Sequence, residues 1–260
     1  MQVMPFNRLH RSLPLVLSTA LLATACGGGS PNPATTAPPP DAKRVDPATM
    51  GNVSGRVTFE GTPPENAAVN LASDPACVTA RPEGLKLDTV MVNNGGLENV
   101  FVYVKDGLGN YYFETPTTPV TLDQKGCHYS PHVFGLRTGQ SLEILNSDQT
   151  LHNVNAMAQV NQAFNMGQAM QGMKSQKTFT KPEVMVRIKC DVHAWMNAYA
   201  GVLSHPYFAV TTNGGAFELK DLPPGTYTIE AWHEKLGTQT QDVTLGAKEA
   251  KTVGFAFKAS

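Results

Sequence analysis

The sequence has few charged residues and no run of basic ones. Its 260 residues include 20 Lys and Arg and 21 Asp and Glu, a formal net charge of −1, and charged residues make up 16% of the chain. Proteins that bind DNA or RNA present clustered Lys and Arg to the phosphates. The composition therefore gives no reason to expect a nucleic acid partner.

Motifs of several large enzyme classes are also missing. The sequence contains no HExxH zinc motif, no GxSxG nucleophile motif and no phosphate-binding loop. We therefore expect a protein that is not an enzyme.

Long apolar runs are absent beyond the first 25 residues. Residues 1–25 combine Arg8 and Arg11 with the run LPLVLSTALLATA, which predicts an export signal too short to span a bilayer. The small residues before Cys26 resemble a bacterial lipoprotein signal, which implies a lipid on Cys26 and a membrane-anchored protein in the periplasm or on the cell surface. Ordinary signal cleavage, which gives a soluble secreted protein, and an uncleaved anchor are the alternatives.

The rest of the chain lacks a long amphipathic helix. Residues 26–50 are rich in Gly, Pro, Ser and Thr, which predicts an extended tether. From residue 53 onward, short alternating apolar runs such as NVFVYV, SLEIL and TYTIEAW are separated by turn sequences such as KDGLGN and LPPG. This pattern predicts an all-β sandwich fold.

The C-terminal part carries a recognisable motif. The stretch GGAFELKDLPPGTYTIEAWHE resembles the carboxypeptidase regulatory-like, or prealbumin-like, β-sandwich module. The resemblance implies a smaller sandwich over residues 207–258, which follows a first domain over residues 51–206. Such a module usually opens with a strand like the one in residues 53–71. Two arrangements stay open: residues 53–71 complete the second module, or they begin the first domain.

Cysteines are few, and their number is informative. Of the four cysteines, Cys26 is assigned to the signal, which leaves Cys77, Cys127 and Cys190. In an oxidising compartment a cysteine is expected to be paired, reactive or bound to a metal. The simplest division joins Cys77 to Cys127 in a disulfide and leaves Cys190 free, although the sequence leaves the other pairings open.

Cys190 lies in KCDVHAWMNAYAG, where His193 and Met196 follow at intervals of three residues. A strand that ends in a tight loop can turn these side chains toward one point, and His152 in LEILNSDQTLHNV stands just before a neighbouring predicted strand. Two imidazoles, a thiolate and a thioether suit copper that cycles between Cu(I) and Cu(II). Zinc more often recruits further thiolates or a carboxylate. The pattern therefore predicts one mononuclear copper site.

These residues resemble the cupredoxins, which are type 1 or blue copper proteins. The Cys-x-x-His-x-x-Met spacing and the Asn-x5-His-Asn-Val context of residues 146–154 are similar to the amicyanin group. The resemblance implies a Greek-key cupredoxin-like β-sandwich and four copper ligands. It also implies that Asn146 ties the ligand segments together by hydrogen bonds. The edge of His193, with Ala194 and Trp195, would then face a redox partner such as a c-type cytochrome.

We expect a protein that transfers single electrons to or from a redox partner outside the cytoplasm. The alternative is periplasmic copper handling by a chaperone or sink that uses the same ligands. A third hypothesis is a surface adhesion or carbohydrate-binding module. Copper oxidases are not indicated, because they need His-x-His pairs and a His-Cys-His run, and a dinuclear copper centre needs a second cysteine on the ligand loop.

Other histidines and methionines form weaker candidates. His128 and His132, next to Cys127 in DQKGCHYSPHV, are an alternative to the disulfide as part of a second metal site. His205 and His233 have no evident partners and are interpreted as structural. A methionine-rich stretch between the first two predicted ligands suits Cu(I) loading, a docking face or plain packing; it contains Met157, Met166, Met170 and Met173.

Overall fold

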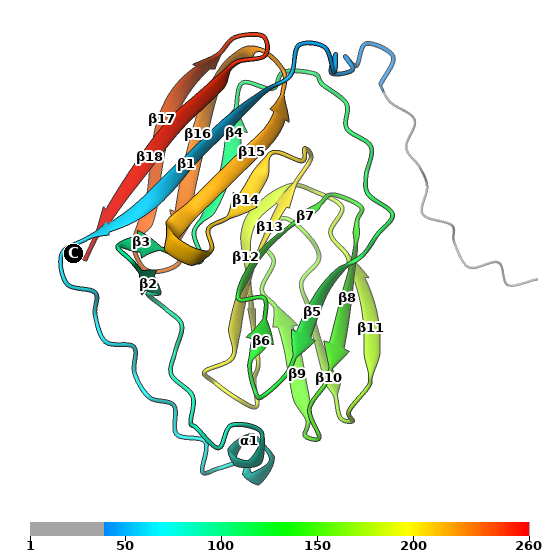
Figure 1. Ribbon diagram of the computed structural model, residues 1–260. Coiled ribbons are helices and arrows are strands. Elements are labelled where there is room, and N and C mark those ends of the chain that lie inside the picture. The colour runs from blue at the N-terminus through cyan, green and yellow to red at the C-terminus, as the bar shows by residue number, and fades with distance from the viewer. Residues whose placement is uncertain (1–38, 260) are drawn as a thin grey trace, which may run out of the picture. The chain divides into compact units, whose positions relative to one another are not determined.

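The computed structural model describes residues 39–259, which form an almost entirely β protein. Figure 1 shows the strands gathered into two groups of sheets. The only α-helix of the described residues is the short α1 (Pro75–Ala80), and a single 3-10 turn, η1 (Asn213–Gly215), precedes β15. None of these described helices is long and apolar enough to cross a membrane. The predicted all-β sandwich fold is confirmed.

The central sandwich is built from strands β5 to β13. One sheet has the order β10-β9-β12-β13-β7 and the other β11-β8-β5-β6. Their bounds are β5 (Val120–Gln124), β6 (Tyr129–Ser130), β7 (Val133–Arg137), β8 (Ser141–Asn146), β9 (His152–Ala156), β10 (Phe164–Gln168), β11 (Lys174–Thr178), β12 (Glu183–Lys189) and β13 (Asn197–Leu203). Their alternating apolar residues pack into one core, which includes Leu122, Ile144, Val154 and Ile188.

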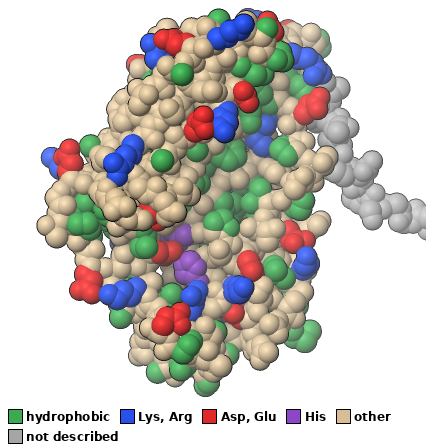
Figure 2. Space-filling view, viewed as in Figure 1, with side chains coloured by type: hydrophobic (Ala, Val, Ile, Leu, Met, Phe, Trp, Pro, Cys, Tyr) green, Lys and Arg blue, Asp and Glu red, His purple; other side chains and the backbone are tan. Residues whose placement is uncertain are grey.

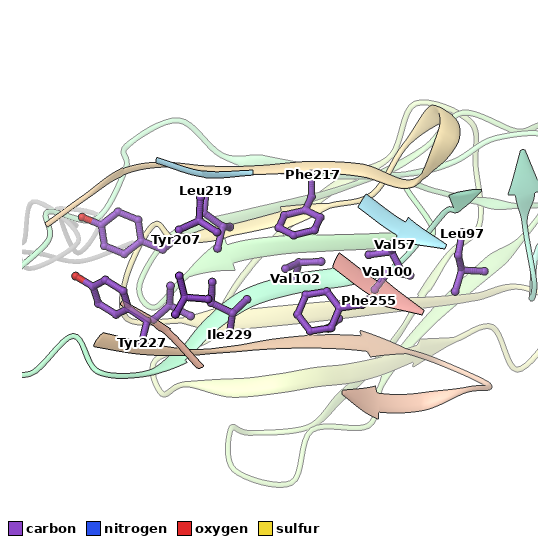
Figure 3. Packing of buried hydrophobic residues seen from close by; sticks show 14 of the residues in the cluster. Val57, Leu97, Val100, Val102, Tyr207, Phe217, Leu219, Tyr227, Ile229 and Phe255 are labelled. Atoms are coloured by element: carbon purple, nitrogen blue, oxygen red, sulfur yellow. The ribbon is translucent and has the colours of Figure 1, made fainter. Parts of the chain in front are cut away.

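The composite sandwich is built from both ends of the described chain. One sheet has the order β15-β1-β3-β2 with β18 beside β1, and the other has the order β14-β4-β16-β17. Their bounds are β1 (Gly51–Glu60), β2 (Val92–Asn93), β3 (Gly96–Leu97), β4 (Phe101–Asp106), β14 (Phe208–Val210), β15 (Ala216–Leu222), β16 (Gly225–His233), β17 (Gly237–Leu245) and β18 (Ala250–Lys258). Figure 3 shows apolar side chains of the two layers pointing toward one another, among them Phe217, Ile229 and Phe255.

The strands do not follow the expected boundary between residues 206 and 207. Strand β1 pairs in parallel with β18 and antiparallel with β15, and β4 pairs with β14 and β16. Residues assigned from the sequence to the first domain therefore complete the C-terminal sandwich, as in the split arrangement. The central sandwich lies in the chain between β4 and β14.

Contacts between aromatic rings join the two sandwiches. Phe101 of β4 and Val133 of the central sandwich belong to one small core. The partly buried Phe208 packs against this core and stacks on Phe101 with ring centroids 5.6 Å apart. The rings of Tyr199 and Trp232 are 5.1 Å apart. This apolar contact anchors the central sandwich on the composite one.

The N-terminal predictions are covered only in part. The export signal, Cys26 and most of the tether lie outside the described residues. Within the part of the tether that is described, Lys43 N donates to Asn110 O at 3.1 Å, and Tyr112 N donates to Lys43 O at 2.9 Å. The chain is therefore already attached to the composite sandwich before β1 begins.

Candidate metal centre

The predicted ligands come from three neighbouring places at one end of the central sandwich. His152 opens β9, Cys190 follows β12, and Met196 directly precedes β13. Strands β9 and β12 are antiparallel neighbours, with Ala156 opposite Ile188. The backbone pairing therefore brings the start of β9 to the loop that follows β12.

The donor atoms of three predicted ligands face one another inside the protein. His152 Nδ1 lies 3.1 Å from His193 Nδ1, and Cys190 Sγ lies 4.0 Å from His193 Nδ1. His152, Cys190 and His193 are all buried, and their donor atoms lie within 4.8 Å of one another. A metal with bonds of roughly 2.0 Å to nitrogen and 2.3 Å to sulfur holds its donors about 3 to 4 Å apart, so these spacings fit a single ion.

The loop of residues 190–196 is closed by its own hydrogen bonds. Cys190 N donates to Met196 O at 3.1 Å, and Met196 N donates to His193 O at 2.9 Å. His193 N also donates to Cys190 Sγ at 3.3 Å. The side chain of Met196 is fully buried. These bonds fix the position of Cys190 relative to His193. The Met196 thioether lies inside the protein, away from solvent.

The outer nitrogen of each histidine meets a carboxylate. His152 Nε2 lies 2.8 Å from Asp148 Oδ2, and His193 Nε2 lies 3.0 Å from Asp74 Oδ2. Such a carboxylate fixes the ring orientation and keeps a proton on the outer nitrogen, which leaves Nδ1 free to bind a metal. The two imidazoles therefore present the same nitrogen inward and are supported in the same way.

The two carboxylates are themselves held in place by the polypeptide. Gly126 N and Cys127 N donate to Asp148 at 2.6 and 2.7 Å. Both residues have positive φ, 65° and 54°, and successive N–H groups in such a turn form a concave anion site. A Cβ on Gly126 would lie 2.5 Å from Arg81 Nε, so glycine suits this position for space as well as for φ.

Asp74 is the N-cap of α1. Its Oδ1 accepts from Ala76 N at 2.8 Å, and its Oδ2 accepts from Thr150 Oγ1 at 2.8 Å. An aspartate before proline at a helix start is a common N-cap. The SDPAC stretch therefore carried a signal for the cap, but nothing in the sequence linked it to His193.

The electrostatics of the cluster favour a thiolate. Burial alone would raise the pKa of Cys190, but hydrogen bonds with His152 and His193 outweigh it and lower this pKa to about 6. Burial would likewise lower the pKa of His152, but the Asp148 carboxylate and the Cys190 sulfur raise it to about 9. Near neutral pH a protonated His152 ring therefore lies beside a charged Cys190 sulfur, and a metal cation that binds both would displace the ring proton.

A disulfide joins Cys77 of α1 to Cys127, with the Cα atoms 5.6 Å apart, and Cys190 is the free cysteine of the described residues. Cys77 Sγ lies 3.6 Å from His193 Nε2. Trp195 Nε1 donates to Cys127 O at 2.9 Å. The disulfide therefore lies directly against the ligand loop.

The expectation of an exposed His193 edge is wrong. The His193 side chain is only 2% exposed, because Asp74 and Cys77 cover its outer nitrogen. Residues 61–91 cross this end of the central sandwich and bring α1 with them. The resemblance could not indicate this cover, because the segment lies far from the ligand motif in the chain.

The hydrogen bonds expected of Asn146 also differ. Within the described residues, its side chain bonds to Thr150 O, Gln168 O and Asp148 N and not to the Cys190 loop. Two other asparagines link the two ligand segments. Asp191 N donates to Asn153 Oδ1 at 2.7 Å, and Asn155 Nδ2 donates to Asp191 Oδ2 at 3.0 Å. Asn146 thus shapes the loop before His152, and Asn153 was missed because it reads as an ordinary polar strand residue.

The remaining histidines of residues 39–259 fall into two groups. His128 and His132 lie close to Asp88 in a second cluster, described further below. His233 is buried in the composite sandwich, where its Nδ1 accepts from Lys235 N and Leu236 N at 3.2 and 3.3 Å. His205 Nδ1 accepts from Tyr207 N at 3.3 Å. Both of these last two histidines stabilise local turns.

Solved structures that match part of the chain include copper proteins. A Cu-containing nitrite reductase from Thermus scotoductus SA-01 is 23% identical, with a TM-score of 0.32, over 36% of this chain and 24% of that one. A mutant amicyanin in its Cu(I) form is 19% identical, with a TM-score of 0.29, over 34% of this chain and 86% of that one. A purple cupredoxin from Nitrosopumilus maritimus is 17% identical, with a TM-score of 0.28, over 32% of this chain and 98% of that one.

The matches are thus partial, and the aligned part spans about a quarter of the nitrite reductase chain. No family model and no curated protein matches the sequence.

Proposed function

We propose that the protein is a mononuclear type 1 copper protein that transfers single electrons to or from a redox partner outside the cytoplasm. The observation that carries the proposal is the inward-facing set of His152 Nδ1, His193 Nδ1 and Cys190 Sγ in a buried site. One thiolate with two imidazoles is the donor set of blue copper sites, completed by a weak axial thioether. Met196, buried next in the same loop, is the proposed axial ligand.

Copper in this site would supply a one-electron Cu(I)/Cu(II) couple. The chain's contribution is to hold the donors in one arrangement for both oxidation states. Asp148 and Asp74 keep the imidazole rings oriented, and the bond from His193 N to the Cys190 sulfur draws charge from the thiolate and so helps to set the potential. A site without an open position for substrate suits a carrier rather than an enzyme.

Location and partner are further parts of the proposal. We place the protein in the periplasm or on the cell surface as a lipoprotein anchored through Cys26. The Cys77–Cys127 disulfide supports an oxidising compartment. Val78, Leu151 and Val192 are exposed and lie next to Cys77, His152 and His193 in the sequence, and we propose this end of the sandwich as the docking face for a redox protein such as a c-type cytochrome.

The decisive experiment is spectroscopic. Purified protein loaded with Cu(II) should show an intense blue absorption band and a type 1 EPR spectrum, and both should disappear reversibly on reduction. Cys190→Ser should abolish the blue band completely, and His152→Ala should abolish or strongly perturb it. His205→Gln, which changes a histidine outside the cluster, is the matched control and should leave both spectra unchanged. A wild-type protein that binds Cu(II) without this spectrum would overturn the proposal.

Copper handling is the second candidate, and exposed methionines favour it. The side chains of Met157 and Met170 are 46% and 67% exposed, and thioethers bind Cu(I). A colourless protein that retains only Cu(I) and passes it to an acceptor chelator would support this function. Replacing Met157 and Met170 by Leu should then slow copper transfer, whereas it should leave the spectrum of an electron carrier intact.

A further inference from the structure

A second cluster of metal-binding side chains lies outside the predicted copper site. His128 Nε2 lies 2.9 Å from Asp88 Oδ2, and His132 Nδ1 lies 3.5 Å from Asp88 Oδ1. One donor atom from each of Asp88, His128 and His132 lies within 4.8 Å of the others. A tetrahedral ion with bonds of about 2.1 Å separates its ligand atoms by roughly 3.4 Å, so the spacings of this cluster fit an ion with little movement.

A fourth residue supports the cluster from the composite sandwich. Glu234 Oε1 lies 2.5 Å from His132 Nε2, on the opposite side of the ring from Asp88. Tyr199 Oη donates to the other oxygen of Glu234 at 3.0 Å. A carboxylate on the outer nitrogen is the usual support of a histidine that binds a metal through its other nitrogen.

A backbone oxygen adds a further potential ligand. His132 Nδ1 lies 3.0 Å from Asn197 O. Burial would lower the pKa of His132, but the Glu234 and Asp88 carboxylates raise it, so without a metal the ring is suited to an ion pair with them. A metal that displaces the Nδ1 proton would find Asp88, His128 and this carbonyl oxygen around it.

The cluster is accessible from solvent. The side chains of His128 and Asp88 are 21% and 26% exposed, whereas that of His132 is 7% exposed. Figure 2 shows histidine atoms at the surface beside acidic side chains, in the part of this face where β6 lies in Figure 1. An ion therefore has a path to the site without unfolding of the core.

We propose that Asp88, His128 and His132 form a second metal site that binds a divalent cation such as Zn(II) with nitrogen and oxygen ligands. The absence of a sulfur ligand distinguishes it chemically from the Cys190 site, because nitrogen and oxygen donors favour Zn(II) or Cu(II) over Cu(I). The site draws on the segment after α1, the central sandwich and, through Glu234, the composite sandwich. A bound ion would therefore cross-link these parts of the fold.

Zinc titration of the full-length metal-free protein, in competition with a chromophoric chelator, tests the proposal. The wild type should bind one more equivalent of Zn(II) than His128→Ala, and Asp88→Asn should lose the same equivalent. His205→Gln should match the wild type. Because His128 and Asp88 are partly exposed, both variants should keep the wild-type circular dichroism spectrum.

Two further variants separate the outcomes. Cys190→Ser should retain the His128-dependent equivalent, so failure of the copper proposal would not remove it. Glu234→Gln should keep the stoichiometry and weaken Zn(II) binding at this site by roughly 10- to 100-fold. Equal stoichiometry and affinity in the wild type and His128→Ala would overturn the proposal and leave the cluster as an ion-pair clamp only.

Discussion

The two sandwiches bury different kinds of residue at comparable depth. The core of the composite sandwich is mainly apolar, with Val57, Leu219 and Phe255 among its members, although His233 and Glu230 of β16 are also buried. The central sandwich has an apolar core of the same type, but at one end it buries two histidines, a free cysteine and the carboxylates that support them. Burying polar and charged groups costs free energy unless each is paired. His152 and His193 pair with Asp148 and Asp74, and these two carboxylates accept further hydrogen bonds. A buried polar network of this kind is typical of a binding site.

Residues 61–91, which cover one end of the central sandwich, give the first and largest test of this contrast. Replacing both Cys77 and Cys127 by Ser removes a cross-link that spans 50 residues, which should lower the free energy of unfolding by about 4 kcal/mol. Urea unfolding measures the loss. Hydrogen exchange should show faster exchange in β9 and β12 and little change in β16 and β17, and an equal loss of protection in both sandwiches would contradict the local role of the cover.

A packing change should affect stability without affecting the metal centre. Leu219 is 1% exposed in the composite core, and Leu219→Ala should cost about 3 kcal/mol of unfolding free energy through loss of buried area and the cavity that remains. The Cu(II) absorption spectrum of the folded variant should equal that of the wild type. Leu142→Ala, the same change in the central core, is the matched control. A spectral change in Leu219→Ala would show that the two sandwiches are coupled.

Acid should act on the composite sandwich through His233. Burial lowers the pKa of His233 from 6.5 to about 4. Below pH 6.5 the unfolded chain therefore binds a proton at His233, whereas the folded chain does not bind it until the pH approaches 4. The free energy of unfolding consequently decreases as the pH falls from 6.5 toward 4. Between pH 7 and pH 5 this histidine should account for a loss of about 2 kcal/mol.

Unfolding curves at the two pH values, compared between the wild type and His233→Gln, measure that contribution. The variant should lose about 2 kcal/mol less than the wild type over this interval. An identical pH dependence in the two proteins would rule out His233 as the acid-sensitive group. The pKa shift of His152 in the central sandwich has the opposite sign, because the neighbouring carboxylate raises this pKa despite burial. Its contribution to stability is therefore lost as the pH rises, not as it falls.

The sequence predicted which residues form strands better than it predicted which strands pair with one another. Alternation of apolar residues in NVFVYV predicts a strand, and β4 (Phe101–Asp106) is one. The same alternation holds whichever sheet a strand joins, so nothing in the pattern showed that β4 pairs with β16 of the composite sandwich. For strand β1 two arrangements stayed open, because only the resemblance to a family module, and not the periodicity of the strand, linked it to the C-terminal module.

The site could be predicted to the extent that its donors lie in a short motif. His152, Cys190 and His193 share a local sequence context, and the structure brings their donor atoms together. Asp74 and Glu234 are contributed by distant segments, and a single aspartate or glutamate in a loop carries no sign of its partner. Contacts of this kind depend on the fold as a whole, which explains why the cover on His193 and the support of His132 were missed.

The parallel pairing of β1 with β18 has a mechanical consequence. Nine successive residue pairs, from Asn52 with Ala250 to Glu60 with Lys258, lie side by side in the same direction. A pulling force applied at the start of β1 and the end of β18 acts along both strands in opposite directions. It must therefore shear the whole ladder of hydrogen bonds at once, whereas an antiparallel terminal pair pulled from one end would open bond by bond. The parallel pair therefore resists a pull between these two strand ends more strongly than an antiparallel pair of the same length would.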